Sequence, residues 1–201
     1  MHACNIVPWF RAYLAEFHGA FFLPPSASIL RGVISHIAWS CPPASLLKLN
    51  VDASIQAPAG MIGLGAIFRD GEVNVLLSAA IRMELVALVA RAEGHAIKFG
   101  IFIALDVGLW SLVVESDSLS VINLILQKSV PLMGLVLEDI FHIAGNDSVS
   151  TFCFAPRIAN RGAHALAQLN CSLTHLLVLL EDYPSSIADV ILDDARSSFV
   201  S

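Results

Sequence analysis

Three carboxylates stand in positions where a carboxylate is unusual. Asp52 lies in the middle of an alternating apolar and polar segment, 47–55, which predicts a half-buried strand, and aspartate is disfavoured within strands. Glu93 has only apolar residues three and four positions away on either side in a predicted helix. Asp117 directly follows a short apolar segment, 111–115. A carboxylate charge placed among apolar residues costs free energy unless it is solvated, paired or bound to a metal.

Each of the three carboxylates also has an ordinary structural explanation. Asp52 can lie on the polar face of its strand together with Lys48 and Asn50. Glu93 can sit at the rim of the core. Asp117 can cap the helix that follows it, because aspartate favours the positive end of a helix.

The three carboxylates could instead converge at one edge of a sheet. Close anionic groups repel one another and raise one another's pKa values, and a divalent cation relieves that repulsion. Oxygen ligands suit Mg²⁺, which takes substrate phosphate oxygens as further ligands. Two such ions ~3.5–4 Å apart can promote hydrolysis of a phosphodiester. Asp52, Glu93 and Asp117 are therefore candidate metal ligands.

The segments that would position these carboxylates follow the order βββ-α-β-α-α-β-α. This order predicts an α/β fold with a mixed sheet and helices on its faces. We expect strands over 47–55, 64–69, 73–78, 111–115 and 150–154, and helices over 83–105, 119–126, 135–143 and 160–169. Residues 173–180 are expected to extend or follow the last of these helices.

The chain divides into three parts by composition. Residues 1–45 are rich in proline and are interpreted as an N-terminal appendage or linker. Residues 46–170 form the predicted domain, and residues 171–201 form a predicted C-terminal helical tail.

Composition restricts the class of protein. The chain has 201 residues, of which 56% are hydrophobic and 14% are charged, so most of it should fold rather than remain disordered. We identify no membrane-spanning run and no signal peptide. The four cysteines are widely spaced, which favours reduced thiols in the nucleus or cytoplasm rather than secretion. We expect a monomer without a small-molecule cofactor, since Gly63-Leu-Gly65 lacks the third glycine of a dinucleotide site.

The formal net charge of −6 argues against an autonomous nucleic-acid clamp, because lysine and arginine are scattered along the chain. The negative net charge does not exclude a metal-dependent nuclease, in which carboxylates hold cations that bind the phosphate.

Several segments in this order resemble the type 1 ribonuclease H domain, and most closely its plant branch related to non-LTR retroelement reverse transcriptases. The resemblance covers 46–170. It rests on Leu47–Ser54, Gly63–Asp70, Ala92–Glu93, Ala104–Leu109, Val113–Leu119 and Pro156–Ala167, with a further tail match at Leu180–Pro184.

The resemblance implies a five-stranded mixed sheet with helices on both faces. It also implies hydrolytic cleavage of the RNA strand of RNA–DNA hybrids with two Mg²⁺ ions, or Mn²⁺, held by four acidic residues. Asp52, Glu93 and Asp117 match three of those residues. Glu84 is a rival to Glu93, because a similar string flanks that residue in bacterial members of the family.

The fourth acidic position of the family falls on His164, four residues after Asn160. Histidine brings no negative charge and is less suited to Mg²⁺ than a carboxylate is. The family's basic protrusion and mobile-loop histidine also have no match. The sequence therefore leaves three hypotheses open: an active hybrid ribonuclease, a weak or inactive nucleic-acid-binding or interaction module, and an α/β protein with no nucleic-acid role.

Overall fold

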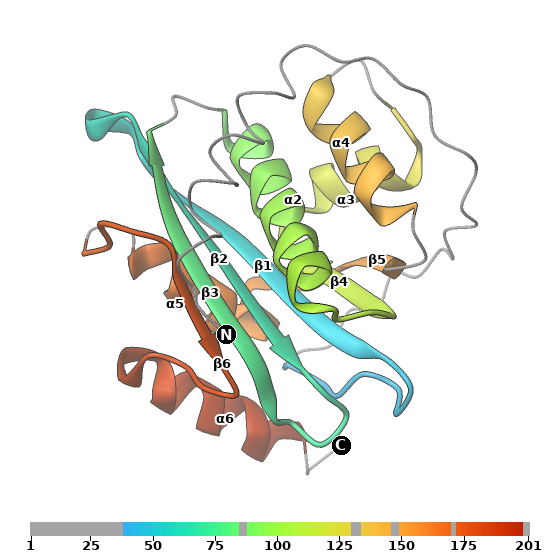
Figure 1. Cartoon of the computed structure of the whole chain (residues 1–201), viewed down its shortest axis with the longest axis vertical. Helices are drawn as coiled ribbons and strands as arrows, with labels where there is room; N and C mark the ends of the chain where they lie inside the picture. Colours follow the sequence, from blue (N-terminus) through green and yellow to red (C-terminus); the bar gives the residue numbers. More distant parts are fainter. Residues whose placement is uncertain (1–37, 85–87, 130–133, 146–148, 170–171, 199–201) are drawn as a thin grey trace.

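The computed structural model describes residues 38–84, 88–129, 134–145, 149–169 and 172–198. Within these residues, six strands form one mixed sheet in the order β5-β4-β1-β2-β3-β6 (Figure 1). Their bounds are β1 Leu47–Gln56, β2 Met61–Arg69, β3 Val75–Glu84, β4 Leu112–Ser116, β5 Val149–Phe154 and β6 Leu177–Leu180. Strand β4 runs parallel to both β1 and β5, whereas β2, β3 and β6 pair antiparallel.

Helices cover both faces of the sheet. The α2 helix (Val89–Val107) lies across β1 and β2, with α3 (Leu119–Leu126) and α4 (Leu135–Ala144) beside it. The α5 helix (Arg161–Gln168) and α6 (Ala188–Ser198) cover the other face (Figure 1). Three short 3₁₀ turns, η1 (Ala57–Ala59), η3 (Arg157–Ala159) and η5 (Ser185–Ile187), complete the described elements.

Glycine allows one helix on each face to approach the sheet closely. A Cβ atom on Gly100 of α2 would lie 2.8 Å from Val51 Cγ1, and a Cβ on Gly65 of β2 would lie 2.4 Å from the Ala163 carbonyl oxygen of α5. Neither contact leaves room for a side chain. The α5 helix packs against β1 as well as β2, so β1 lies between α2 and α5 and side chains from both helices meet at the same strand.

The predicted fold class, a mixed sheet with helices on both faces, is confirmed, but the sheet has six strands among the described residues where five were expected. Two local predictions are wrong. The helix expected from residue 83 begins only at Val89, because Met83 and Glu84 still pair with β2 as the end of β3. Residues 173–180, expected to extend or follow the last helix, contain strand β6, which pairs with Leu77–Ala80 of β3, whereas the later part of the predicted helical tail does form the α6 helix. Short apolar runs such as Leu177–Leu180 do not distinguish a helix from a strand by periodicity.

The proposed division of the chain into three parts stays a prediction. Residues 1–37 lie outside the described residues. Trp39, which that division assigns to the appendage, is buried against the sheet and donates a hydrogen bond to Asn50. Among the described helices none is long and apolar enough to cross a membrane.

Candidate active site

The structure brings Asp52, Glu93 and Asp117 together. Each offers a carboxylate oxygen that lies within 4.8 Å of the other two. The parallel register of β1 and β4 aligns Val51 with Ser116, so Asp52 and Asp117, which come next, lie side by side where β4 ends. Glu93 reaches them from the N-terminal part of α2. A strand interior, a strand end and a helix therefore supply one side chain each.

Burial makes this group of acids electrostatically unusual. Asp52 is 0% exposed and Glu93 is 6% exposed. Burial first, and then the negative charges of Glu93 and Asp117, raise the pKa of Asp52 to about 9 against the opposing charge of Arg157. Burial and the charge of Asp117 raise the pKa of Glu93 to about 8. At neutral pH the metal-free site thus retains protons that a cation would displace.

Two of these buried oxygens are suited to a hard cation. Among the described residues, Asp52 Oδ1 and Glu93 Oε2 have no hydrogen-bond partner. A buried polar atom without a partner is costly, and a divalent cation would supply the missing interaction. The donor set consists of carboxylate oxygens, which Mg²⁺ and Mn²⁺ favour. The residues present therefore fit a divalent metal ion.

His164 reaches the same group from α5. Its Nδ1 lies 2.8 Å from Asp52 Oδ2, and its Nε2 lies 3.0 Å from Gln168 Nε2. Burial, followed by the positive charge of Arg157, lowers the pKa of the His164 imidazole. Because two acceptors would repel at 2.8 Å, a proton must lie between His164 and Asp52. The position that the resemblance matches to a fourth acid thus holds a hydrogen-bonding partner of the buried aspartate.

Arg157 brings a positive charge to the open side of the site. Its Nε lies 3.7 Å from Asp117 Oδ2, and its Nη2 lies 2.9 Å from His164 Nδ1. The Arg157 side chain is 62% exposed, so the guanidinium faces solvent as well. Sequence reasoning gave this arginine no role, although it lies seven residues before His164 and just after the strand next to β4.

Asn160 attaches the start of α5 to β1. Its Nδ2 donates a hydrogen bond of 2.9 Å to the Val51 carbonyl oxygen, next to Asp52 in the chain. The side chain is fully buried. Since His164 comes one helical turn later, this contact helps to place the imidazole over Asp52.

Glu84 does not join the acidic group. It ends β3, pairs with Met61 and is exposed. Among the described residues, the glutamate that accompanies Asp52 and Asp117 is therefore Glu93.

The chain is similar to known proteins in sequence and in fold. The family described as reverse transcriptase-like matches residues 50–170. None of the curated proteins matches the sequence. Among solved structures, the N-terminal RNase H domain of Rv2228c from Mycobacterium tuberculosis superposes with a TM-score of 0.56 and 18% identity, covering 63% of this chain and 93% of that one.

Two further structures share the fold. RNase H1 of the halophilic archaeon Halobacterium salinarum has a TM-score of 0.54 and 16% identity, over 63% of this chain and 97% of that one. LC11-RNase H1, solved in complex with an RNA/DNA hybrid, has a TM-score of 0.51 and 18% identity, over 61% of this chain and 94% of that one. The β6 strand and the α6 helix lie beyond the residues that the family match covers.

Proposed function

Because the chain belongs to the reverse transcriptase-like family and carries an RNase H-like domain, we propose that it is a metal-dependent hydrolase that cleaves the RNA strand of RNA–DNA hybrids. The observation that carries this proposal is the meeting of Asp52, Glu93 and Asp117 within 4.8 Å. A known relative of the same fold, LC11-RNase H1, was solved in complex with an RNA/DNA hybrid, which supports the substrate class.

We assign the metal ligands to Asp52, Glu93 and Asp117, and propose two Mg²⁺ ions, with Mn²⁺ as a substitute. Bound divalent cations lower the pKa of a water molecule and offset the charge that develops on the phosphodiester oxygens. The two carboxyls with raised pKa values, Asp52 and Glu93, must release protons before they can ligate a cation.

His164 and Arg157 would act on the substrate side of the site. The proton between His164 and Asp52 keeps one oxygen of that aspartate occupied and holds the imidazole in place. Arg157 presents a guanidinium that can donate to phosphate oxygens in a forked geometry. We propose that Arg157 contacts the phosphate backbone, and that 2′-hydroxyl contacts in the wide minor groove give preference for the RNA strand.

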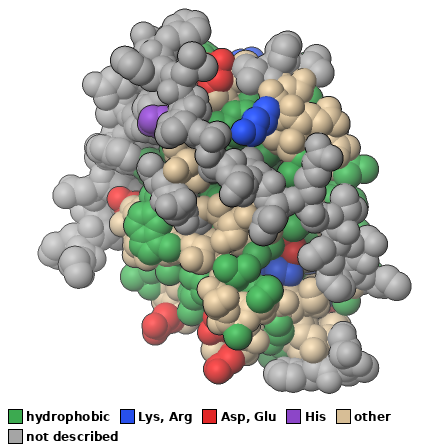
Figure 2. All heavy atoms as spheres, turned by 90° about the vertical axis from the view of Figure 1, so that its right-hand side faces the viewer, with side chains coloured by type: hydrophobic (Ala, Val, Ile, Leu, Met, Phe, Trp, Pro, Cys, Tyr) green, Lys and Arg blue, Asp and Glu red, His purple; other side chains and the backbone are tan. Residues whose placement is uncertain are grey.

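Weak and salt-sensitive binding is expected from the charge of the chain. The formal net charge is −6. On the face drawn in Figure 2, the described lysine and arginine side chains appear as separate spots among hydrophobic and uncharged ones. Because the chain carries net negative charge, we expect affinity for a polyanion to come from the proposed metal site and a few contacts such as Arg157.

The test is cleavage of a labelled RNA–DNA hybrid under titration with Mg²⁺ and then Mn²⁺. Asp52→Asn and Glu93→Gln should abolish metal-dependent cleavage, whereas Glu84→Gln should leave it intact as a matched control. A wild-type protein that cleaves at no concentration of either metal would disprove the hydrolase assignment.

A catalytically weak or inactive module that binds nucleic acid or a partner is the second candidate. The observation that favours it is His164 at the fourth position, where it contacts Asp52 in place of an acid. Hybrid binding without cleavage would establish this candidate. Absence of both, with Asp52→Asn raising stability in the absence of metal, would favour an α/β protein without a nucleic-acid role.

We further propose that the protein acts as a monomer in a reducing intracellular compartment, the nucleus or the cytoplasm. Among the described cysteines, Cys41 and Cys153 are free thiols, which is compatible with that setting.

A further inference from the structure

A second pair of polar side chains lies directly beside the acidic group on the same two strands. Asn50 of β1 and Glu115 of β4 are register partners in the parallel pairing. Asn50 Nδ2 donates a hydrogen bond of 2.9 Å to Glu115 Oε2. Asp52 comes two residues after Asn50 on β1 and therefore projects to the same face of the sheet, and Asp117 comes two residues after Glu115, just past the end of β4, with its carboxylate beside that of Asp52. The Asn50–Glu115 pair is thus the cross-strand pair next to Asp52 and Asp117.

The orientation of the Asn50 amide is fixed by its surroundings. Its Oδ1 accepts hydrogen bonds from Trp39 Nε1 at 2.9 Å and from Arg69 Nη2 at 3.1 Å. Indole and guanidinium nitrogens only donate, so Oδ1 must face them and Nδ2 must face Glu115. Asn50 is fully buried, so bulk solvent does not compete for these hydrogen bonds.

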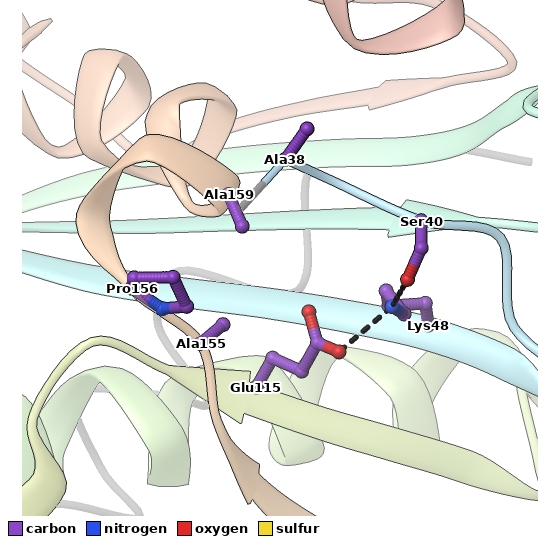
Figure 3. Close-up of a pocket in the computed structure, with 7 residues that line it drawn as sticks. All are labelled: Ala38, Ser40, Lys48, Glu115, Ala155, Pro156 and Ala159. Carbon is purple, nitrogen blue, oxygen red and sulfur yellow. Dashed lines mark hydrogen bonds and ion pairs between the residues drawn. The ribbon is translucent and has the colours of Figure 1, made fainter. Parts of the chain in front are cut away.

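Glu115 is held from its other side. Its Oε1 forms an ion pair of 2.7 Å with Lys48 Nζ, and Figure 3 shows the two side chains pointing toward each other from β4 and β1. Pro156 and Ala159 line the same small hollow, in the segment that carries Arg157. Lys48 neutralises Glu115, so the pair adds a rigid link between the strands without adding net negative charge to the acidic group.

We propose that Asn50 and Glu115 are positioning residues, whose hydrogen bond sets the separation of Asp52 and Asp117 for metal binding. Metal binding requires all three carboxylates in their ionised form, in which they repel one another, and that repulsion acts to spread β1 from β4 at this end. A buried, fully oriented cross-strand hydrogen bond one pair away opposes the spreading. This inference rests on the proposed function, because it takes Asp52 and Asp117 to be metal ligands.

Asn50→Asp tests the link by changing one atom. The new carboxylate can still accept from Trp39 and Arg69, but its second oxygen faces Glu115 Oε2 instead of donating to it. The double variant Asn50→Asp/Glu115→Gln exchanges donor and acceptor and restores the hydrogen bond. Asp139→Asn is the control, since it disrupts another buried ion pair, with Lys98 between α4 and α2, on the other face of the sheet.

The main readout is Mn²⁺ binding without substrate, measured by electron paramagnetic resonance of the free ion, together with urea unfolding of each variant. Asn50→Asp should weaken Mn²⁺ binding about tenfold, and the double variant should recover most of that loss, as expected for directly coupled residues. Asp139→Asn should lower stability and leave Mn²⁺ binding unchanged. If Asn50→Asp does not fold, Asn50→Ser, which removes the link without adding charge, should show the same weakening.

The outcomes separate this inference from the proposed function. If the parent binds Mn²⁺ and Asn50→Asp, or Asn50→Ser, binds it equally well while losing stability, the pair is merely structural and the inference is overturned. Absence of Mn²⁺ binding in the parent overturns the proposed metal site and this inference with it. Loss of Mn²⁺ binding in Asp139→Asn to the same extent would also overturn it, because general destabilisation would then explain the effect.

Discussion

His164 Nδ1 lies 2.8 Å from Asp52 Oδ2, and one proton is shared across that contact. A neutral, hydrogen-bonding side chain therefore occupies the place where a fourth carboxylate would increase the repulsion among buried acids. This relieves electrostatic cost in the metal-free protein and leaves the proposed metal site with one anionic ligand fewer than the resemblance implies.

We expect His164→Asp to lower the stability of the metal-free protein and to raise its affinity for metal. The added carboxylate should lower the metal-free free energy of unfolding by about 1–3 kcal/mol, as unpaired buried charges do. It should also increase Mg²⁺ affinity and the rate of hybrid cleavage. Urea unfolding in EDTA and cleavage under Mg²⁺ titration check the two effects. His164→Asn, which adds no charge, is the control, and equal cleavage by both variants would show that the missing acid does not limit turnover.

Stability of the metal-free protein should fall as pH rises. In the folded state Asp52 has a pKa of about 9 and Glu93 of about 8, against ordinary values of 3.8 and 4.5. Between the unfolded and the folded pKa values, the folded state binds more protons than the unfolded state does. The contribution of these two groups to stability is therefore greatest below about pH 4 and declines as the pH rises to about 9.

The free energy of unfolding should fall by at most about 1.4 kcal/mol per pH unit for each group. Mg²⁺ binding should displace the protons of the two carboxyls and so reduce this fall. Urea unfolding between pH 5 and pH 9 in EDTA measures the slope. Asp52→Asn should flatten it, and an unchanged slope in that variant would assign the pH dependence to other groups.

Removal of the Arg157 guanidinium should weaken hybrid binding without unfolding the protein, because its side chain is 62% exposed. For Arg157→Ala we expect the slope of log affinity against log salt to fall by about 1, as for one lost phosphate contact. Arg157→Lys should restore part of the affinity but not the forked hydrogen bonding. Fluorescence anisotropy with a labelled hybrid at several salt concentrations gives the slope, and an unaltered slope would remove Arg157 from the interface.

The α6 helix should be essential to the fold although it lies outside the family match. Arg69 is fully buried in β2, and its Nη1 pairs with Asp194 Oδ2 of α6 at 2.8 Å. Asp194→Ala leaves that buried charge unpaired and should cost about 3–5 kcal/mol. The neighbouring Asp193 is half exposed and pairs with Arg161. Asp193→Ala is therefore a matched control that should lower stability by under about 1 kcal/mol. Urea unfolding compares the two, and similar losses would contradict the expectation.

Local pattern was sufficient to predict the elements that carry the acids. Asp52 interrupts an alternating strand, Glu93 interrupts an apolar helix face and Asp117 follows an apolar strand, so each was visible in a short window of sequence. Their convergence required the parallel pairing of β1 with β4, which the resemblance to a known family supplied and local sequence did not.

Long-range partners were not predictable from local sequence. Arg157 looks like any solvated arginine until β5 is placed beside β4. Trp39 lies in a proline-rich stretch whose composition indicates a linker, yet its indole completes the hydrogen bonding of Asn50. Strand β6 forms because it pairs with the edge of β3. The four residues of β6 alone give no sign of this pairing partner.

Ser198 Oγ of α6 lies 3.3 Å from the Trp39 carbonyl oxygen and 2.9 Å from the Asp194 carbonyl oxygen, so one proton is shared between the two acceptors, and the first and last described segments of the chain meet. Asp194 of α6 also pairs with Arg69, whose guanidinium lies 3.9 Å from the centre of the Trp39 ring, so releasing one segment removes contacts of the other. Amide hydrogens near Trp39 and those in α6 should therefore exchange with solvent through a shared opening event, and the covering of this side of the sheet behaves as a single cooperative unit.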